Sequence, residues 1–191
     1  MKYLFLILFA FIISINYSFA QDQDIALELD NALAMSEKGD NASLEISLSK
    51  INTEVDKQAN EGSSDFKDKL LGASSSLKAM IPMLSKGGST LSQIPKLINT
   101  IKLLLGAHKL SKMLGGGGSL LTQAAGLKSN LGLIKMGSSI LGGKSDQMGS
   151  LLGAAMGGVA QLEKGGMGAK TAEPALKKQL GSILDLAKGA L

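Results

Sequence analysis

The stretch SDQMGSLLGAAMGGVAQL, residues 145–162, decides how this chain folds. Apolar side chains recur in it at every third or fourth position, which is the spacing of one face of an α-helix. They are Met148, Leu152, Ala155, Val159 and Leu162. This period predicts an amphipathic helix over residues 145–162, with its apolar face buried against the rest of the fold.

Glycine recurs at every fourth position of the same stretch, at Gly149, Gly153 and Gly157. Glycine weakens a helix by about 1 kcal/mol relative to alanine, so three in register indicate a packing role. A row of missing side chains lets another helix approach closely. We therefore predict that these three glycines form a helix-packing groove, an interaction surface and not a catalytic site. In a helical bundle, the row would let one helix nestle against another inside the fold.

Helical periodicity continues on both sides of this stretch. It predicts helices over residues 24–35, from Leu44 to about residue 60, from Ser64 onward, around residues 97–105 and 120–134, and after Pro174. Pro82 is expected to kink or end its helix, and residues 165–168 are expected to form a loop. The pattern predicts an all-α fold: a bundle or a short repeat array of amphipathic helices, joined by Gly-rich hinges, with no convincing strand.

A short motif, Gly-Ser-x-Leu, recurs four times along the glycine-rich part of the chain. It begins at Gly88, Gly118, Gly149 and Gly181, at intervals of 30, 31 and 32 residues. Such a unit is long enough for two short helices or for one helix with a return loop. Because Gly, Ser and Leu dominate this region, the motif can recur by chance as well as through a true repeat.

The N-terminus has the pattern of a secretory signal peptide. Lys2 is followed by an apolar run from Tyr3 to Ile15 and by the small residues Ser18 and Ala20. This order predicts a signal peptide over residues 1–20, cleaved after Ala20, and hence an exported protein, periplasmic or secreted. The alternative is an uncleaved membrane anchor, but the run is shorter than the ~20 residues that span a bilayer. The chain has no cysteine, so no disulfide stabilises it.

The distribution of charge divides the chain after Ala20 into two compositional segments. Residues 21–68 hold twelve acidic residues and four lysines, whereas residues 69–191 hold fifteen lysines and four acidic residues. The glycines shift near Gly62, with twenty-two of the twenty-four beyond it. We predict an acidic N-terminal helical segment, residues 21–62, and a Lys/Gly-rich helical region, residues 63–191. The acidic helices are expected to dock electrostatically on the Lys-rich part, so that high salt loosens them.

Several kinds of chemistry find no support in the sequence. His108 is the single histidine, and no cluster of metal ligands surrounds it in the sequence, so we expect a solvated side chain and no metal site. A Ser-His-Asp nucleophile lacks its Gly-x-Ser-x-Gly elbow. The region of excess lysine has no arginine and no aromatic residue after Phe66, which argues against specific nucleic-acid recognition. We expect no enzyme activity and no cofactor.

Two functional hypotheses remain. The first is a non-catalytic binding or structural protein of the cell envelope or secretome, acting through self-association or a protein partner. The second is a membrane-active amphipathic protein that meets an anionic membrane surface and associates through its glycine row. The run from Met148 to Ala160 has thirteen residues without a charge, too few to span a bilayer, which favours the first hypothesis.

Overall fold

The computed structural model describes residues 25–62, 64–84 and 92–189; most of these are helical, and none forms a strand. The predicted all-α bundle is confirmed. An N-terminal helix covers residues 25–38. It is followed by α2 (Asn41–Asn60), α3 (Lys67–Leu84), α4 (Ile94–Gly115), α5 (Ala124–Gly137), α6 (Ser145–Lys164) and α7 (Gly166–Lys188), with short 3₁₀ segments at Leu120–Gln123 and Ser138–Lys144.

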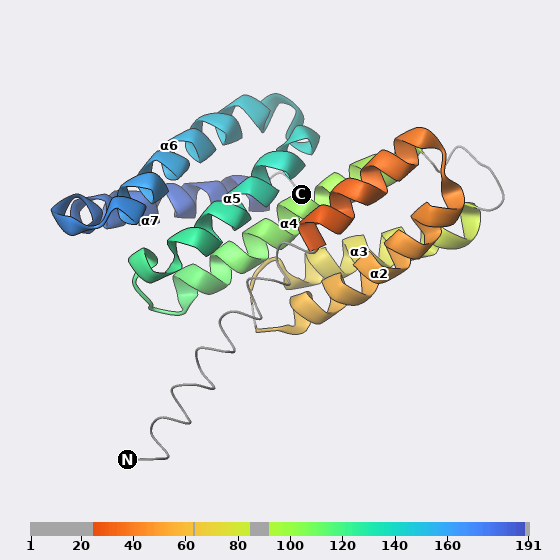
Figure 1. The fold of residues 1–191 in the computed structure, drawn as a ribbon, viewed down its shortest axis with the longest axis horizontal. Coiled ribbons are helices and arrows are strands. Elements are labelled where there is room, and N and C mark those ends of the chain that lie inside the picture. Colours follow the sequence, from red (N-terminus) through yellow and green to blue (C-terminus); the bar gives the residue numbers. More distant parts are fainter. Residues whose placement is uncertain (1–24, 63, 85–91, 190–191) are drawn as a thin grey trace, which may run out of the picture.

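The helix α4 is the centre of the fold. Figure 1 shows the N-terminal helix, α2 and α3 gathered along one side of α4, and α5, α6 and α7 on the other. Every residue of α4 from Ile101 to His108 is buried as a result. A helix enclosed on all sides needs side chains that suit a core all round, and the run Leu103-Leu104-Leu105 supplies them.

Several breaks between helices coincide with glycines in the left-handed region, as expected for Gly-rich hinges. Gly39 has φ 71°, and Asp40 then begins α2 by accepting a hydrogen bond from the Ser43 amide at 3.2 Å. Gly117 (φ 68°) follows the end of α4, and Gly142 (φ 55°) interrupts the path from α5 to α6. Because glycine has no Cβ, it adopts these angles without the strain that other residues incur.

The start of α7 differs from its prediction. The helix begins at Gly166, so the predicted loop at residues 165–168 shrinks to a sharp turn, and Pro174 lies inside the helix. The buried face extends N-terminally from Leu176 through Ala172 and Ala169. Alanines give only a weak periodic signal, which is why the prediction began the helix at the proline. The helix α3 likewise contains Pro82 and continues to Leu84.

The suggested repeat has no common structural position among the described residues. Gly118 lies in the loop that precedes a 3₁₀ segment, whereas Gly149 and Gly181 lie inside α6 and α7. The copy at Gly88 lies outside the described residues. The recurrence of the motif therefore reflects composition, and the fold is a bundle.

The predicted signal peptide, residues 1–20, also lies outside the described residues, so its cleavage stays a prediction. Among the described residues, no helix is long and apolar enough to cross a membrane. The compositional boundary at Gly62 falls in the turn between α2 and α3, and these two helices pack against each other across it.

Candidate functional site

The three glycines Gly149, Gly153 and Gly157 lie on the outward face of α6. All three are at least partly exposed, and a Cβ placed on any of them would meet no atom of another element within 4 Å. The predicted apolar face is correct: Met148, Leu152, Ala155, Val159 and Leu162 are the buried residues of α6. Since that face packs toward α7 and α5, the glycine row points the other way.

The row therefore does not let two helices nestle together within the described fold, contrary to the expectation for a bundle. The glycine of α6 that touches another helix is the next one, Gly158, whose Cβ would lie 3.2 Å from Leu176 Cδ1. The expectation failed because a period of four residues defines a stripe but does not say which way the stripe faces.

Close helix packing occurs instead where α4 crosses α5. A Cβ on Gly106 would lie 2.7 Å from the Asn130 carbonyl oxygen, and one on Gly137 would lie 2.4 Å from the Leu103 amide nitrogen. Backbone touches backbone at both positions, so any larger residue would force the helices apart. The sequence signal, which our prediction missed, is a glycine that interrupts the apolar run of α4.

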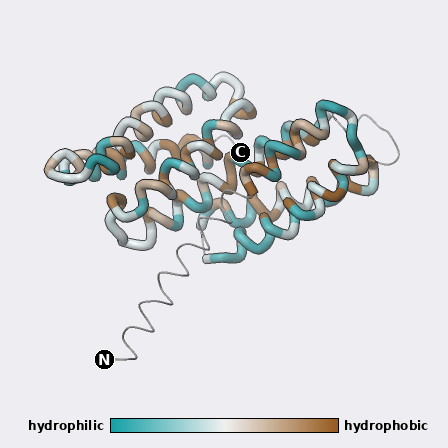
Figure 2. Tube along the Cα trace, in the orientation of Figure 1, coloured by the Kyte–Doolittle hydropathy of each residue, from teal (hydrophilic) through white to brown (hydrophobic). Residues whose placement is uncertain are grey.

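The outward face of α6 is uncharged along most of its length. Between Gln147 and Gln161 its exposed positions carry glycine, alanine or serine. Charged residues stand only at the two ends of the helix, with Asp146 near the start and Glu163 and Lys164 at the end. The helix is accordingly pale along much of its course in Figure 2, whereas hydrophilic positions recur along α2 and α3. We call this surface, centred on the glycine row, the α6 face.

His108 is buried, in contrast to the solvated side chain that the sequence suggested. Its side chain is fully enclosed, and its Nε2 lies 3.1 Å from the Gln58 carbonyl oxygen. A carbonyl can only accept, so Nε2 carries the hydrogen, and Nδ1 accepts the hydroxyl hydrogen of Ser64 at 2.6 Å. His108 follows Ile101 and Leu104 on the same helical face, a position that could have revealed its burial.

The surroundings of His108 favour its neutral form. Burial lowers the pKa of the imidazole below its ordinary value of 6.5, and the nearby positive charge of Lys112 lowers this pKa further. The hydrogen bond to the Gln58 carbonyl opposes these effects. Ser64 also accepts a hydrogen bond from the Phe66 amide at 3.2 Å, which holds the start of α3. The serine and histidine thus join three elements of the fold.

An ion pair between a buried lysine and an exposed aspartate joins α4 to the N-terminal helix. Lys102 is only 2% exposed, and its Nζ lies 2.5 Å from Asp30 Oδ1, whose side chain is 46% exposed. A second pair joins Asp65 to Lys188 at the end of α7. Both pairs connect the acidic stretch of residues 21–68 with later lysines, which supports the expected electrostatic docking; its sensitivity to salt stays a prediction.

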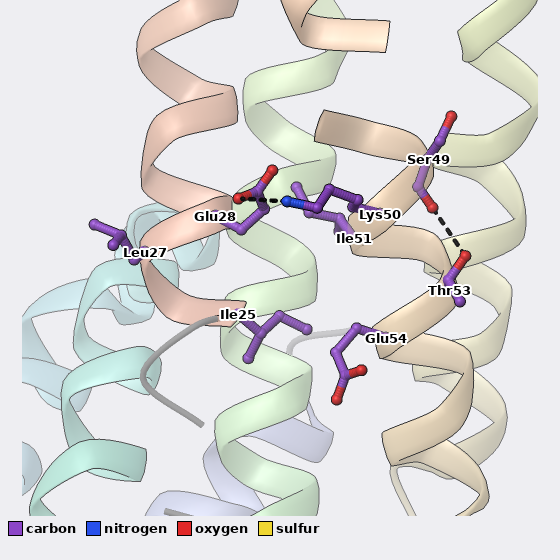
Figure 3. Close-up of a pocket in the computed structure, with 8 residues that line it drawn as sticks. All are labelled: Ile25, Leu27, Glu28, Ser49, Lys50, Ile51, Thr53 and Glu54. Carbon is purple, nitrogen blue, oxygen red and sulfur yellow. Dashed lines mark hydrogen bonds and ion pairs between the residues drawn. The ribbon is translucent and has the colours of Figure 1, made fainter. Parts of the chain in front are cut away.

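An open groove of about 710 Å³ lies between the N-terminal helix and α2. Figure 3 shows Glu28 and Lys50 pointing toward one another across it, and their charged atoms are 3.8 Å apart. Ile51 lines the groove at the level of this pair, and Ile25 and Glu54 line it below the pair in this view. Among the described residues, no group of three or more His, Asp or Glu side chains could hold a metal ion.

Comparisons with family models, curated proteins and solved structures produce no match to this chain.

Proposed function

We propose that this chain is an exported, non-catalytic helical protein that binds another protein or a second copy of itself in the cell envelope or secretome. Its contact surface is the α6 face. The observation that carries the proposal is the row of outward-facing glycines, Gly149, Gly153 and Gly157, at which a Cβ would contact no other element of the described fold.

Nothing among the described residues requires glycine at these positions. Their φ angles are negative, and a methyl group would fit at each without a contact. Alanine would therefore stabilise α6 by up to about 1 kcal/mol at each position. A helix that gives up this stability exposes a strip of bare backbone, onto which another helix can pack closely.

The chemistry of the α6 face also favours contact over catalysis. Between Gln147 and Gln161 the exposed positions hold no titratable side chain, so the surface offers no general acid, no general base and no metal ligand. Close van der Waals packing is what such a surface can provide. The few charges at its ends, such as Asp146 and Lys164, can orient a partner.

A second candidate is contact with an anionic membrane surface. The neighbouring helix α7 exposes Lys170, Lys177 and Lys178, which would be attracted to anionic headgroups. The glycines and alanines of the α6 face would bury little apolar area in a bilayer, however, and this is why we place the candidate second.

One pair of measurements separates these functions. Sedimentation velocity over a range of concentrations is recorded for the wild type and for the triple variant Gly149→Leu, Gly153→Leu, Gly157→Leu. We expect the wild type to self-associate and the variant to stay monomeric, with a urea midpoint no lower than that of the wild type, because leucine favours a helix more than glycine does. The control is Gly72→Leu, an exposed glycine of α3 with equally open space around it, which should behave as the wild type.

Co-sedimentation with anionic vesicles is the second measurement. Vesicle binding that is lost in Lys170→Gln, Lys177→Gln, Lys178→Gln, together with a monomeric wild type, would favour the membrane function. If the leucines change neither self-association nor vesicle binding, the α6 face mediates neither self-association nor membrane contact.

A further inference from the structure

The turn between α2 and α3 is where early and late parts of the described chain meet. It covers residues 61–66, of which the structure describes all but 63. On one side His108 of α4 contacts Ser64, and on the other Lys188 of α7 pairs with Asp65. Lys188 Nζ also lies 6.0 Å from the centre of the buried Phe66 ring, and Lys69 Nζ donates to the Lys188 carbonyl at 3.1 Å.

His108 is the part of this junction that can change charge near neutral pH. Its two ring nitrogens have opposite roles, with Nε2 donating to the Gln58 carbonyl and Nδ1 accepting from Ser64. Protonation turns Nδ1 into a donor, so the Ser64 hydroxyl hydrogen must leave it. The charged ring would also lie in a fully enclosed site, where an ion loses the stabilisation that water gives.

The groups around the ring do not compensate for a positive charge. On α4 itself, Lys112 and Lys109 act on the imidazole as like charges. From the end of α2, the backbone carbonyls of Gln58 and Glu61 favour the charged form but carry no net charge. From the start of α3 the contact is the Ser64 hydroxyl. No carboxylate of the described residues takes part in these interactions.

We propose that the contact of His108 with Ser64 and Gln58 is an acid-sensitive latch, which releases the α2–α3 turn from α4 when the imidazole is protonated. The end of α7 is released with the turn, because Lys188 is held by Asp65 and by the Phe66 ring. Lys112 also contacts the turn: the Cε of its aliphatic chain lies 3.1 Å from where a Cβ of Gly62 would be. The latch is a conformational device separate from the α6 face.

The direction of the pH effect follows from the ring's environment. Because the closed turn holds His108 with a lowered pKa, the closed state is fully stable above pH 6.5 and weakens as the pH falls below that value. Between 6.5 and the pKa of the closed form, the opening equilibrium rises by a factor approaching about ten for each pH unit. Below the pKa of the closed form the effect levels off.

Amide hydrogen exchange of the full chain between pH 7.5 and 5, corrected for the intrinsic exchange rate, measures this opening. We expect exchange to accelerate together in peptides covering residues 58–70 and 180–189, while the centre of α6 stays protected. His108→Gln is the control, because a glutamine amide can donate and accept as the neutral imidazole does but takes up no proton in this range. Its exchange should not depend on pH.

A second variant keeps the histidine. Lys112→Gln removes the like charge that acts most strongly on the ring, so the pKa of His108 rises toward 6.5 and the acceleration at pH 5 becomes smaller than in the wild type. Lys128→Gln, an exposed lysine of α5, is the matched control and should respond as the wild type does. The imidazole NMR signals of this single histidine follow the protonation directly.

Two results would overturn the latch. One is a wild type whose exchange in both peptides is independent of pH down to 5. The other is an equal acid response in His108→Gln, which would assign the opening to carboxylates instead.

Discussion

The two sides of α4 bury different kinds of residue. Toward the N-terminal helix, α2 and α3, it buries Lys102 and His108, each held by a partner from that side. Toward α5 it presents Gly106 and packs backbone against backbone. On the polar side, a few directional hydrogen bonds and an ion pair fix how the neighbouring elements pack on α4. On the glycine side, the close steric fit of the two backbones fixes the packing. The single helix α4 thus joins two halves that are stabilised in different ways.

The remaining buried polar groups follow the same division. Ser47, Asn52, Gln58 and Ser74 lie in α2 and α3, where Ser74 Oγ donates to Asn52 Oδ1 at 3.0 Å. Beyond α4, Asn130 of α5 is the one buried polar side chain of the described residues. Changes of buried charge should therefore act mainly in the N-terminal half, and changes of buried side-chain volume mainly where α5 packs on α4.

The largest effect is expected where α4 and α5 cross. In Gly137→Ala the new methyl group would lie 2.4 Å from the Leu103 amide nitrogen and 2.5 Å from the Asn99 carbonyl oxygen. We predict a loss of about 3 kcal/mol or more in the free energy of unfolding, measured by urea titration. The control is Gly132→Ala on the same helix, where a Cβ meets nothing within 4 Å and alanine should stabilise. Equal changes in stability at the two positions would contradict the close backbone packing of α5 on α4 at Gly137.

On the polar side of α4, we compare how much two substitutions lower the free energy of unfolding. Asp30→Ala leaves the buried Lys102 without its partner, and we predict a loss of about 1–3 kcal/mol, below that of a fully buried pair because Asp30 is half exposed. Lys102→Met removes the buried charge and keeps most of the volume, so its effect should be much smaller. Urea titrations of both variants test this order, and the reverse order would show that the pair is not what stabilises this side.

A pH effect of the C-terminal half is expected at Glu173. This carboxylate accepts from the Leu120 amide at 3.1 Å, and this bond together with Lys177 and Ser119 lowers its pKa below the ordinary 4.5. Its contribution is therefore present above pH 4.5 and disappears as the pH falls through the lowered pKa. The difference in urea midpoint between the wild type and Glu173→Gln should shrink over that range. A difference that is constant from pH 6 to 3 would contradict this role.

The smallest effect is expected from breaking an exposed ion pair, and this effect should depend on salt. The Asp65–Lys188 pair is exposed, so Asp65→Asn should lower stability by no more than about 1 kcal/mol at low ionic strength, and less at high ionic strength. Urea titrations at two salt concentrations measure the change. A larger loss that salt does not reduce would mean that Asp65 acts through the structure of the turn and not through its charge.

Much of the fold follows from the apolar period alone. The buried residues of α6 were all identified from the sequence, and so was the end of α2 near residue 60. These features are local, because each depends on residues within about one turn of helix. Where local signals were weak, as with the alanines before Pro174, the predicted start of α7 was wrong.

The candidate site was harder to predict because it depends on which elements become neighbours. The sequence places Gly149, Gly153 and Gly157 on one stripe, but only the packing of α6 on α7 and α5 shows that the stripe faces outward. The burial of His108 likewise depends on the turn between α2 and α3, whose residue Ser64 lies 44 positions away along the chain.

Some glycines of this chain serve the fold, as Gly106 and Gly137 do, and those of the α6 face do not. Urea unfolding of the triple variant Gly149→Ala, Gly153→Ala, Gly157→Ala tests this distinction most directly. Because each methyl group would enter open space on a helix with ordinary φ angles, we predict a gain of about 1–3 kcal/mol in the free energy of unfolding. A loss of stability would show that the fold itself packs on the row, and would contradict the outward α6 face.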